Sequence, residues 1–154
     1  MKNLFDRFKP IIYVQISPER LILRNVKSGE VISEIPEVAI DYDKKERIVG
    51  VGSEASFHSS NPSVKIINPF AHPRTLLSDF TVAEQLLKIF IRRMQGSSFF
   101  SVSPKIVIHP LGEPAGGFTQ IERRAFHELA LGVGASQVVF REGRVLTDQE
   151  ILSG

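Results

Sequence analysis

The sequence predicts an α/β domain built on a mixed sheet with crossover helices. Its first third is a series of short apolar runs separated by turn residues, a pattern typical of strands. Two later segments repeat apolar residues at helical spacing. A short buried-type strand accompanies each of these helices, so the order meander, helix, strand, helix, strand favours an α/β fold over an all-β or all-α fold.

Composition sets the broad class of protein. The chain has 154 residues, of which 42% are hydrophobic, enough for one domain with a proper core. Its 19 Lys and Arg against 17 Asp and Glu are spread along the sequence, which gives no support for a nucleic-acid partner. The absence of cysteine excludes a disulfide scaffold and a cysteine-ligated zinc site. Without a spanning apolar run or a secretory signal, we expect a cytoplasmic protein.

The first nine residues predict a short amphipathic helix that ends before Pro10. Leu4, Phe5 and Phe8 recur at helical spacing among lysine and arginine residues. Such a helix is either an ordinary chain terminus or a contact with the anionic inner face of the cytoplasmic membrane. Leu4, Phe5 and Phe8 are therefore the membrane-contact candidates.

Strands dominate the next part of the chain. The apolar runs predict strands at residues 11–16, 21–26 and 47–52, and a third strand over 31–40 that is broken by Pro36. The turn at residues 17–20 makes the first two a hairpin. Residues 53–78 are rich in Ser, Asn, Pro and His, so we expect connecting structure or a small subdomain there, extended only at 64–67.

A first helix is predicted to begin at a capping box formed by Thr81 and Glu84 and to end at Gly96. Its apolar residues recur at helical spacing and predict one buried face: Val82, Leu86, Leu87, Phe90, Ile91 and Met94.

The second helix follows a strand at residues 105–108 and a glycine- and proline-rich loop. Thr119 and Glu122 form its capping box, and Gly132 and Gly134 end it. The core face is predicted to hold Ile121, Ala125, Phe126 and Leu129. The solvent face is predicted to hold Arg123, Arg124 and Glu128. A last strand is predicted at residues 137–140.

No local motif for catalysis or metal binding stands out. Residues 112–117 lie between a strand and a helix but lack the Gly-Lys-Ser/Thr ending of a phosphate loop, so a flexible loop is the better interpretation. The four histidines, none at metal-site spacing, are interpreted as surface or strand-end residues: His58, His72, His109 and His127. We therefore expect no catalytic residue, no metal and no cofactor.

Several segments are similar to one family. The run from Thr119 to Ala125 and the turn from Gly132 to Ala135 resemble the Thr-Gln-Val-Glu-Arg-Arg-Ala helix and the Gly-Ala-Gly-Ala turn of MreB, the rod-shape-determining bacterial actin homologue. The strand from Ser103 to Pro110 is similar to the family's Ser-Pro-Arg-Val strand that ends in Val-Pro. The resemblance implies an actin-like (ribonuclease H-like) ATPase fold in which residues 10–154 form domain I alone, incomplete relative to the full two-domain fold.

The departures from the family fall on nucleotide chemistry. Where the family has the Asp-Leu-Gly-Thr phosphate hairpin, this chain has Gln15, Ile16, Ser17 and Pro18. The neutral Gln15 cannot supply the charge that organises Mg²⁺, and Pro18 lacks an amide donor. Glu142 matches only the first glutamate of the family's Ile-Glu-Glu-Pro. Gln15, Ser17 and Glu142 are thus expected to be a non-functional remnant of a nucleotide site, and we expect no enzymatic activity.

The resemblance therefore implies a non-catalytic MreB-like module of the cell-shape and cytoskeletal machinery. Its expected partner is a full-length bacterial actin homologue or that protein's cell-shape partners, with Arg123, Arg124 and Glu128 as surface candidates and homo-oligomerisation as a further option. One alternative is a residual ATP-binding protein that completes its site by oligomerising. Another is an adaptor recruited to a pilus or secretion assembly. Apolar surface near residues 145–146 and 151–152 is expected to be left for a partner.

Overall fold

The computed structural model describes residues 9–96, 102–112 and 114–154. The membrane-contact candidates Leu4, Phe5 and Phe8 lie outside the described residues. The strands are β1 (Ile11–Ile16), β2 (Leu21–Asn25), β3 (Val31–Glu34), β4 (Val38–Asp41), β5 (Arg47–Val51), β6 (Val64–Ile67), β7 (Lys105–Pro110) and β8 (Gln137–Phe140). The helices are the 3-10 helix η2 (Gly52–His58), α1 (Phe80–Gln95), α2 (Gln120–Gly132) and α3 (Asp148–Ser153). No helix within these ranges has the length and apolarity needed to cross a membrane.

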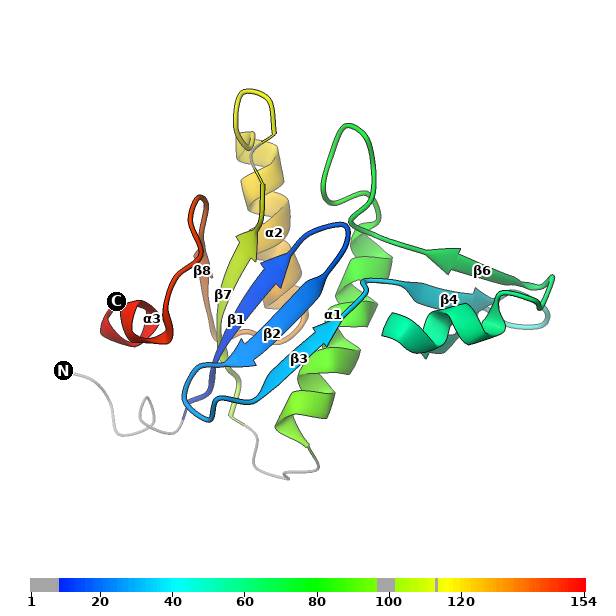
Figure 1. The fold of residues 1–154 in the computed structure, drawn as a ribbon, viewed down its shortest axis with the longest axis horizontal. Helices are drawn as coiled ribbons and strands as arrows, with labels where there is room; N and C mark the ends of the chain where they lie inside the picture. The colour runs from blue at the N-terminus through cyan, green and yellow to red at the C-terminus, as the bar shows by residue number, and fades with distance from the viewer. Residues whose placement is uncertain (1–8, 97–101, 113) are drawn as a thin grey trace.

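A five-stranded mixed sheet in the order β3-β2-β1-β7-β8 forms the centre of the molecule. β1, β2 and β3 pair antiparallel, whereas β7 is parallel to both β1 and β8. The central strand β1 places Tyr13 opposite Arg24 on β2 and Val107 on β7. Helices α1 and α2 supply the connections that lead into β7 and β8, and Figure 1 shows both behind the same face of the sheet. The predicted mixed sheet with crossover helices is confirmed.

The main core lies between this inner face of the sheet and the two long helices. Alternate β1 residues, Ile12, Val14 and Ile16, are fully buried because every second side chain of a strand points to the same face. Leu86 and Phe90 of α1 pack in the same cluster. Edge-to-face contacts extend it toward β8 through three phenylalanines: Phe118, Phe126 and Phe140.

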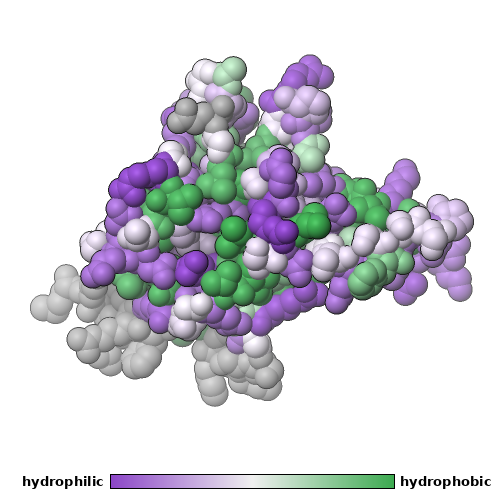
Figure 2. Space-filling view, viewed as in Figure 1, coloured by the Kyte–Doolittle hydropathy of each residue, from purple (hydrophilic) through white to green (hydrophobic). Residues whose placement is uncertain are grey.

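The outer face of the sheet has a smaller apolar cluster that the C-terminal helix α3 covers. Tyr13, Val26 and Val107 are buried there beneath Ile151 of α3. The apolar surface expected at residues 151–152 is therefore only half present, because Ile151 is 5% exposed whereas Leu152 is 43% exposed. Figure 2, which views this face, shows apolar side chains at the surface among polar ones.

A second, three-stranded sheet in the order β5-β4-β6 projects from the first, toward the right of Figure 1. The expected third strand broken by Pro36 is wrong, since β3 and β4 belong to different sheets. Proline cannot donate to a sheet ladder, so Pro36 falls where the chain leaves one sheet for the other. The segment 53–78 contains most of η2 and the strand β6, and β6 belongs to this smaller sheet.

The first helix begins earlier than its predicted capping box. Asp79 is the N-cap of α1, and its carboxylate accepts a hydrogen bond from the Val82 amide at 3.0 Å. Thr81 therefore lies inside the helix, and the box with Glu84 does not form; Asp is also a better N-cap than Thr. The predicted end at Gly96 is confirmed.

The second helix keeps its predicted capping box. The Thr119 hydroxyl accepts from the Glu122 amide at 3.1 Å, and the Glu122 carboxylate accepts from the Thr119 amide at 2.8 Å. Ile121, however, is 81% exposed and not part of the core face. It precedes the buried Phe126 by five positions, about 500° of helical rotation, which leaves the two side chains about 140° apart.

Candidate functional site

The carboxyl ends of the parallel strands β1, β7 and β8 meet at one edge of the large sheet. In open α/β sheets, ligands bind in the crevice beyond this edge. Ser17 follows β1, the glycine-rich loop at residues 111–118 follows β7, and Glu142 follows β8. All three sequence-predicted remnant positions, Gln15 included, therefore lie at or beside the same edge.

The turn after β1 is closed on itself. The Ser17 hydroxyl donates to the Arg20 carbonyl and accepts from the Arg20 amide, both at 3.1 Å. The Ser17 amide donates to the same carbonyl, also at 3.1 Å. Every polar group of Ser17 that faces the turn thus has a partner inside it, and this hydroxyl and amide cannot serve a phosphate without opening the turn.

Gln15 is half-buried on β1, with Ile22 of β2 and His109 of β7 as its register neighbours. Strand alternation puts its side chain on the outer face of the sheet, the face of Tyr13. A neutral amide at this position supplies no charge to a cation.

The segment after β6 is hydrogen-bonded to the same turn. The Asn68 side-chain amide donates to the Pro18 carbonyl at 2.8 Å, and its carbonyl oxygen accepts from the Phe70 amide at 2.9 Å. Phe70 is fully buried and anchors the segment in the main core. A groove of about 580 Å³ lies between this segment and the glycine-rich loop. Its lining includes Pro18, His72, Arg74, Leu76, Pro114 and Phe118.

Glu142 is held by an arginine of α2. Arg123 donates from Nε to Oε1 at 2.8 Å and from Nη2 to Oε2 at 3.2 Å, a two-pronged geometry that satisfies both carboxylate oxygens. Glu142 also lines a second groove, of about 400 Å³, against the glycine-rich loop. Arg123 is exposed on the predicted solvent face of α2, and its guanidinium also binds this carboxylate, which lies 19 positions further along the chain.

The outer face of α2 is otherwise open. Arg124 and Glu128 are exposed as predicted, and no ion pair to either is present among the described residues. Ile121 and Leu131 are apolar residues on the same exposed side, at 81% and 42% exposure. The helix thus presents a mixed apolar and charged surface, with Arg123 drawn toward Glu142 at its margin.

The burial and the hydrogen bonds of His109 were not predicted from the sequence. His109 lies at the end of β7, as its interpretation as a strand-end residue predicted, and it is fully buried there. Its Nδ1 lies 2.6 Å from the Tyr13 hydroxyl and its Nε2 lies 2.9 Å from the Gly143 carbonyl oxygen. Burial lowers the pKa of His109, an effect that the Gly143 hydrogen bond opposes and that Arg141 reinforces. One sequence signal pointed to this burial: His109 lies two positions after the apolar Val107 and therefore on the same face of the strand.

Metal ligation has no support in the described part of the chain, where no group of three or more His, Asp or Glu side chains converges. His72 and His127 are exposed, as expected of surface histidines.

Comparison with known proteins finds related sequences over most of this chain. Residues 19–147 match the family described as MreB/Mbl protein. The chain is 34% identical over 146 residues to the cell shape-determining protein MreB of Pasteurella multocida, an alignment that covers 92% of this chain and 40% of that protein. The corresponding protein of Escherichia coli K12 is 32% identical over 148 residues, covering 92% and 41%. The chain thus spans about two fifths of the length of these relatives.

Solved structures share the fold. A structure of MreB 5 of Spiroplasma citri bound to AMPPNP superposes with a TM-score of 0.70 at 20% identity, covering 87% of this chain and 38% of that one. The ADP-bound form gives 0.69. The large mixed sheet and its helices are therefore part of an actin-like fold.

Proposed function

The chain belongs to the MreB/Mbl family, and on that basis we propose that it is a non-catalytic binding module that modulates assembly of a full-length relative at the inner face of the membrane. Its relatives are cell shape-determining proteins, so the proposed setting is the cytoplasmic cell-shape machinery. A second copy of this chain is a further partner in this proposal.

Two contacts at the sheet edge support a non-catalytic role. Ser17 uses its hydroxyl and amide within its own turn. Glu142 has both carboxylate oxygens engaged by Arg123, which opposes a role as a general base for water. Gln15 adds no charge for a magnesium ion.

The observation that carries the binding role is the exposure of Ile121. A large aliphatic side chain that is 81% exposed on the first turn of α2 contributes apolar surface that no described residue covers. Arg124 and Glu128 lie one and two turns further along the exposed side and would give such an interface polar specificity.

Co-sedimentation with filaments of the full-length MreB of the same cell tests this role. We expect the wild-type chain to pellet with the filaments at a fixed stoichiometry, and Ile121→Asp to reduce the pelleted fraction. Phe57→Asp is the matched control, because Phe57 is a comparably exposed apolar residue, at 77%, on η2. A chain that stays in the supernatant, or an equal loss in both variants, contradicts the proposal.

Membrane contact rests on the N-terminal residues alone. The double change Phe5→Glu and Phe8→Glu should release the chain from vesicles of anionic lipid, since it removes the apolar insertion and adds repulsion. Binding that survives both changes would exclude this segment as the anchor.

Residual nucleotide binding is the second candidate function. It is favoured by the groove beside Glu142 at the carboxyl edge of the sheet, where α/β proteins bind ligands. Isothermal titration with Mg-ATP distinguishes the two. Micromolar binding that Glu142→Ala abolishes would support the nucleotide role, and no heat of binding would support the non-catalytic module.

A further inference from the structure

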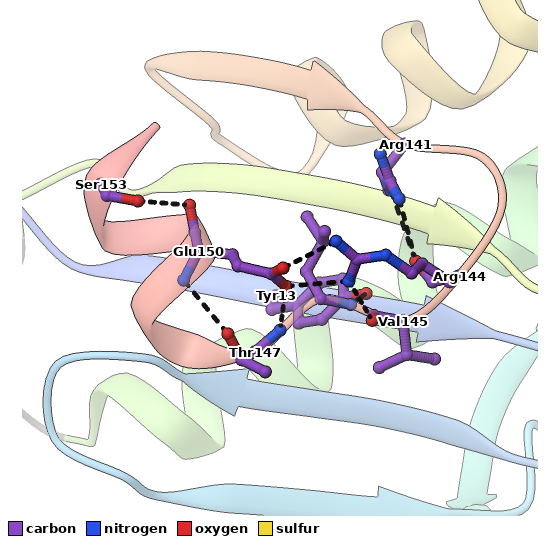
Figure 3. Close-up of polar contacts among 8 residues, drawn as sticks. Tyr13, Arg141, Arg144, Val145, Thr147, Glu150 and Ser153 are labelled. Carbon is purple, nitrogen blue, oxygen red and sulfur yellow. Dashed lines mark hydrogen bonds and ion pairs between the residues drawn. The ribbon is translucent and has the colours of Figure 1, made fainter.

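Residues 143–153 cross the outer face of the large sheet (Figure 3). We call them the C-terminal segment. Polar contacts attach it to the rest of the chain. The Gly143 carbonyl accepts from His109, the Leu146 amide donates to the Tyr13 hydroxyl at 3.0 Å, and Asp148 lies 3.7 Å from Arg24. Arg141 also donates to the Arg144 carbonyl, at 3.2 Å from Nη2. Apolar contacts add to these, since Ile151 and Leu146 pack on the cluster of Tyr13, Val26 and Val107.

The segment is ordered by its own side chains. Thr147 and Glu150 form a capping box for α3. Arg144 donates to both Glu150 oxygens, at 2.7 and 3.0 Å. These internal bonds, drawn in Figure 3, hold residues 144–150 as one unit, so the unit can leave the sheet without first unravelling.

The hydrogen-bond directions at Tyr13 depend on the charge of His109. Leu146 can only donate its amide hydrogen, so the Tyr13 oxygen accepts there. His109 Nε2 faces a carbonyl oxygen and must carry a hydrogen, which leaves Nδ1 of the neutral ring to accept from the Tyr13 hydroxyl. The chain of bonds therefore fits the neutral ring alone.

Protonation reverses one link. A hydrogen on Nδ1 would face the oxygen that already accepts from Leu146, and the Tyr13 hydroxyl hydrogen would lose its acceptor. Either the Tyr13 hydroxyl hydrogen stays buried without an acceptor, or the Tyr13 side chain moves and its bond to the Leu146 amide is broken, and both outcomes cost free energy.

We propose that the C-terminal segment is a latch over the outer face of the sheet and that protonation of His109 opens it. The charged groups on this side of the sheet either oppose a positive charge on the ring or are already paired. Arg141, at the end of β8, opposes a second positive charge, and Arg144 on the segment is neutralised by Glu150. Arg24 on β2 is paired with Asp148, and Lys105 begins β7 on the same face. Opening would expose Tyr13 and Val107, which the segment now covers.

Amide hydrogen exchange followed by NMR on the full chain tests the latch. Between about pH 7.5 and about pH 5, after correction for intrinsic exchange, we expect the protection of the Leu146 amide, which is bonded across the latch, to fall by about tenfold or more. The amides of Leu86 and Phe90 in α1 should keep theirs. The ring signals of His109 and the Leu146 amide shift should titrate with a common midpoint.

Variants separate the latch from general loss of structure. Tyr13→Phe should loosen the segment at both pH values, and His109→Gln should abolish the pH dependence. His127→Gln, at an exposed histidine, should behave as wild type. Protection that does not change with pH, or that falls equally in α1, overturns the proposal. The wild-type titration decides the question even if His109→Gln does not fold.

Discussion

Arg123 and Glu142 join the first turn of α2 to the end of β8 through two parallel hydrogen bonds of 2.8 and 3.2 Å. Both carboxylate oxygens of Glu142 are therefore engaged by the Arg123 guanidinium. Glu142 also lines the smaller groove together with the glycine-rich loop.

A double-mutant cycle of Arg123→Ala and Glu142→Ala measures this pair. Because the side chains are 51% and 37% exposed, we expect a coupling energy of only about 0.2–1 kcal/mol from urea unfolding, smaller at high salt. Arg124→Ala in place of Arg123→Ala is the control. Coupling of Glu142 to Arg124 of the same size would show that the pair is not specific.

The N-cap of α1 gives a direct test of the corrected helix start. Asp79→Ala should lower the free energy of unfolding by about 1 kcal/mol, because it removes the acceptor of the Val82 amide. Thr81→Ala, two residues on, should change it by less than about half that amount. Equal costs, read from chemical denaturation, would restore the capping box predicted at Thr81.

Phe126 is the buried aromatic of α2 and contacts Phe118 and Phe140. Phe126→Ala should cost about 3–5 kcal/mol, since it leaves a cavity where α2 meets the sheet. The adjacent exposed residue supplies the control, and His127→Ala should change the unfolding midpoint little. A small effect of Phe126→Ala would mean that α2 is not packed as described.

Gly52 makes the turn from β5 into η2 with a φ of 65°, and a Cβ there would lie 2.6 Å from Oε2 of Glu34. Gly52→Ala should destabilise by about 1–3 kcal/mol, because it strains the backbone and displaces the carboxylate that accepts from the Ser53 amide. Gly116→Ala, also at positive φ but with open space around it, isolates the backbone part. Thermal unfolding of both variants should rank Gly52→Ala as the less stable.

Glu150 predicts an acid-sensitive α3. Hydrogen bonds from Arg144 and then from the Thr147 amide lower the pKa of this carboxyl to about 2. A depressed native pKa stabilises the folded state above the carboxyl's ordinary pKa, and that contribution is lost as the pH falls toward about 2. NMR titration should show the shift, and Glu150→Gln should remove this part of the acid dependence. A normal midpoint for Glu150 would contradict the contacts of the C-terminal segment.

Local sequence signals predicted an element correctly where residues within one helical turn decide the outcome. The Thr119 and Glu122 box is such a case, because both partners lie within one turn. The Thr147 and Glu150 box of α3 carries the same signal and was missed, since only a short apolar pattern follows it. The start of α1 was predicted at Thr81, whereas Asp79, which the sequence analysis did not consider, is its N-cap.

Contacts between distant segments could not be predicted in the same way. The Arg123 and Glu142 pair, the Asn68 bond to Pro18 and the Tyr13 and His109 pair join residues 19, 50 and 96 positions apart. Each depends on strand order and register, which period-two alternation does not specify. The family resemblance located the sheet edge, and only the fold showed which of its polar groups were already engaged.

Pro36, where the chain leaves the large sheet, also bears on how the fold could vary. The chain leaves the large sheet after the edge strand β3, forms the small sheet and returns through α1. The small sheet therefore separates no paired strands of the large sheet. It is an appendage in topological terms, and a shorter bridge from β3 to α1 would keep the order β3-β2-β1-β7-β8 intact. Val38, Ile40 and Val51 nevertheless belong to the main core, so shortening residues 38–67 would keep this strand order and remove part of that core.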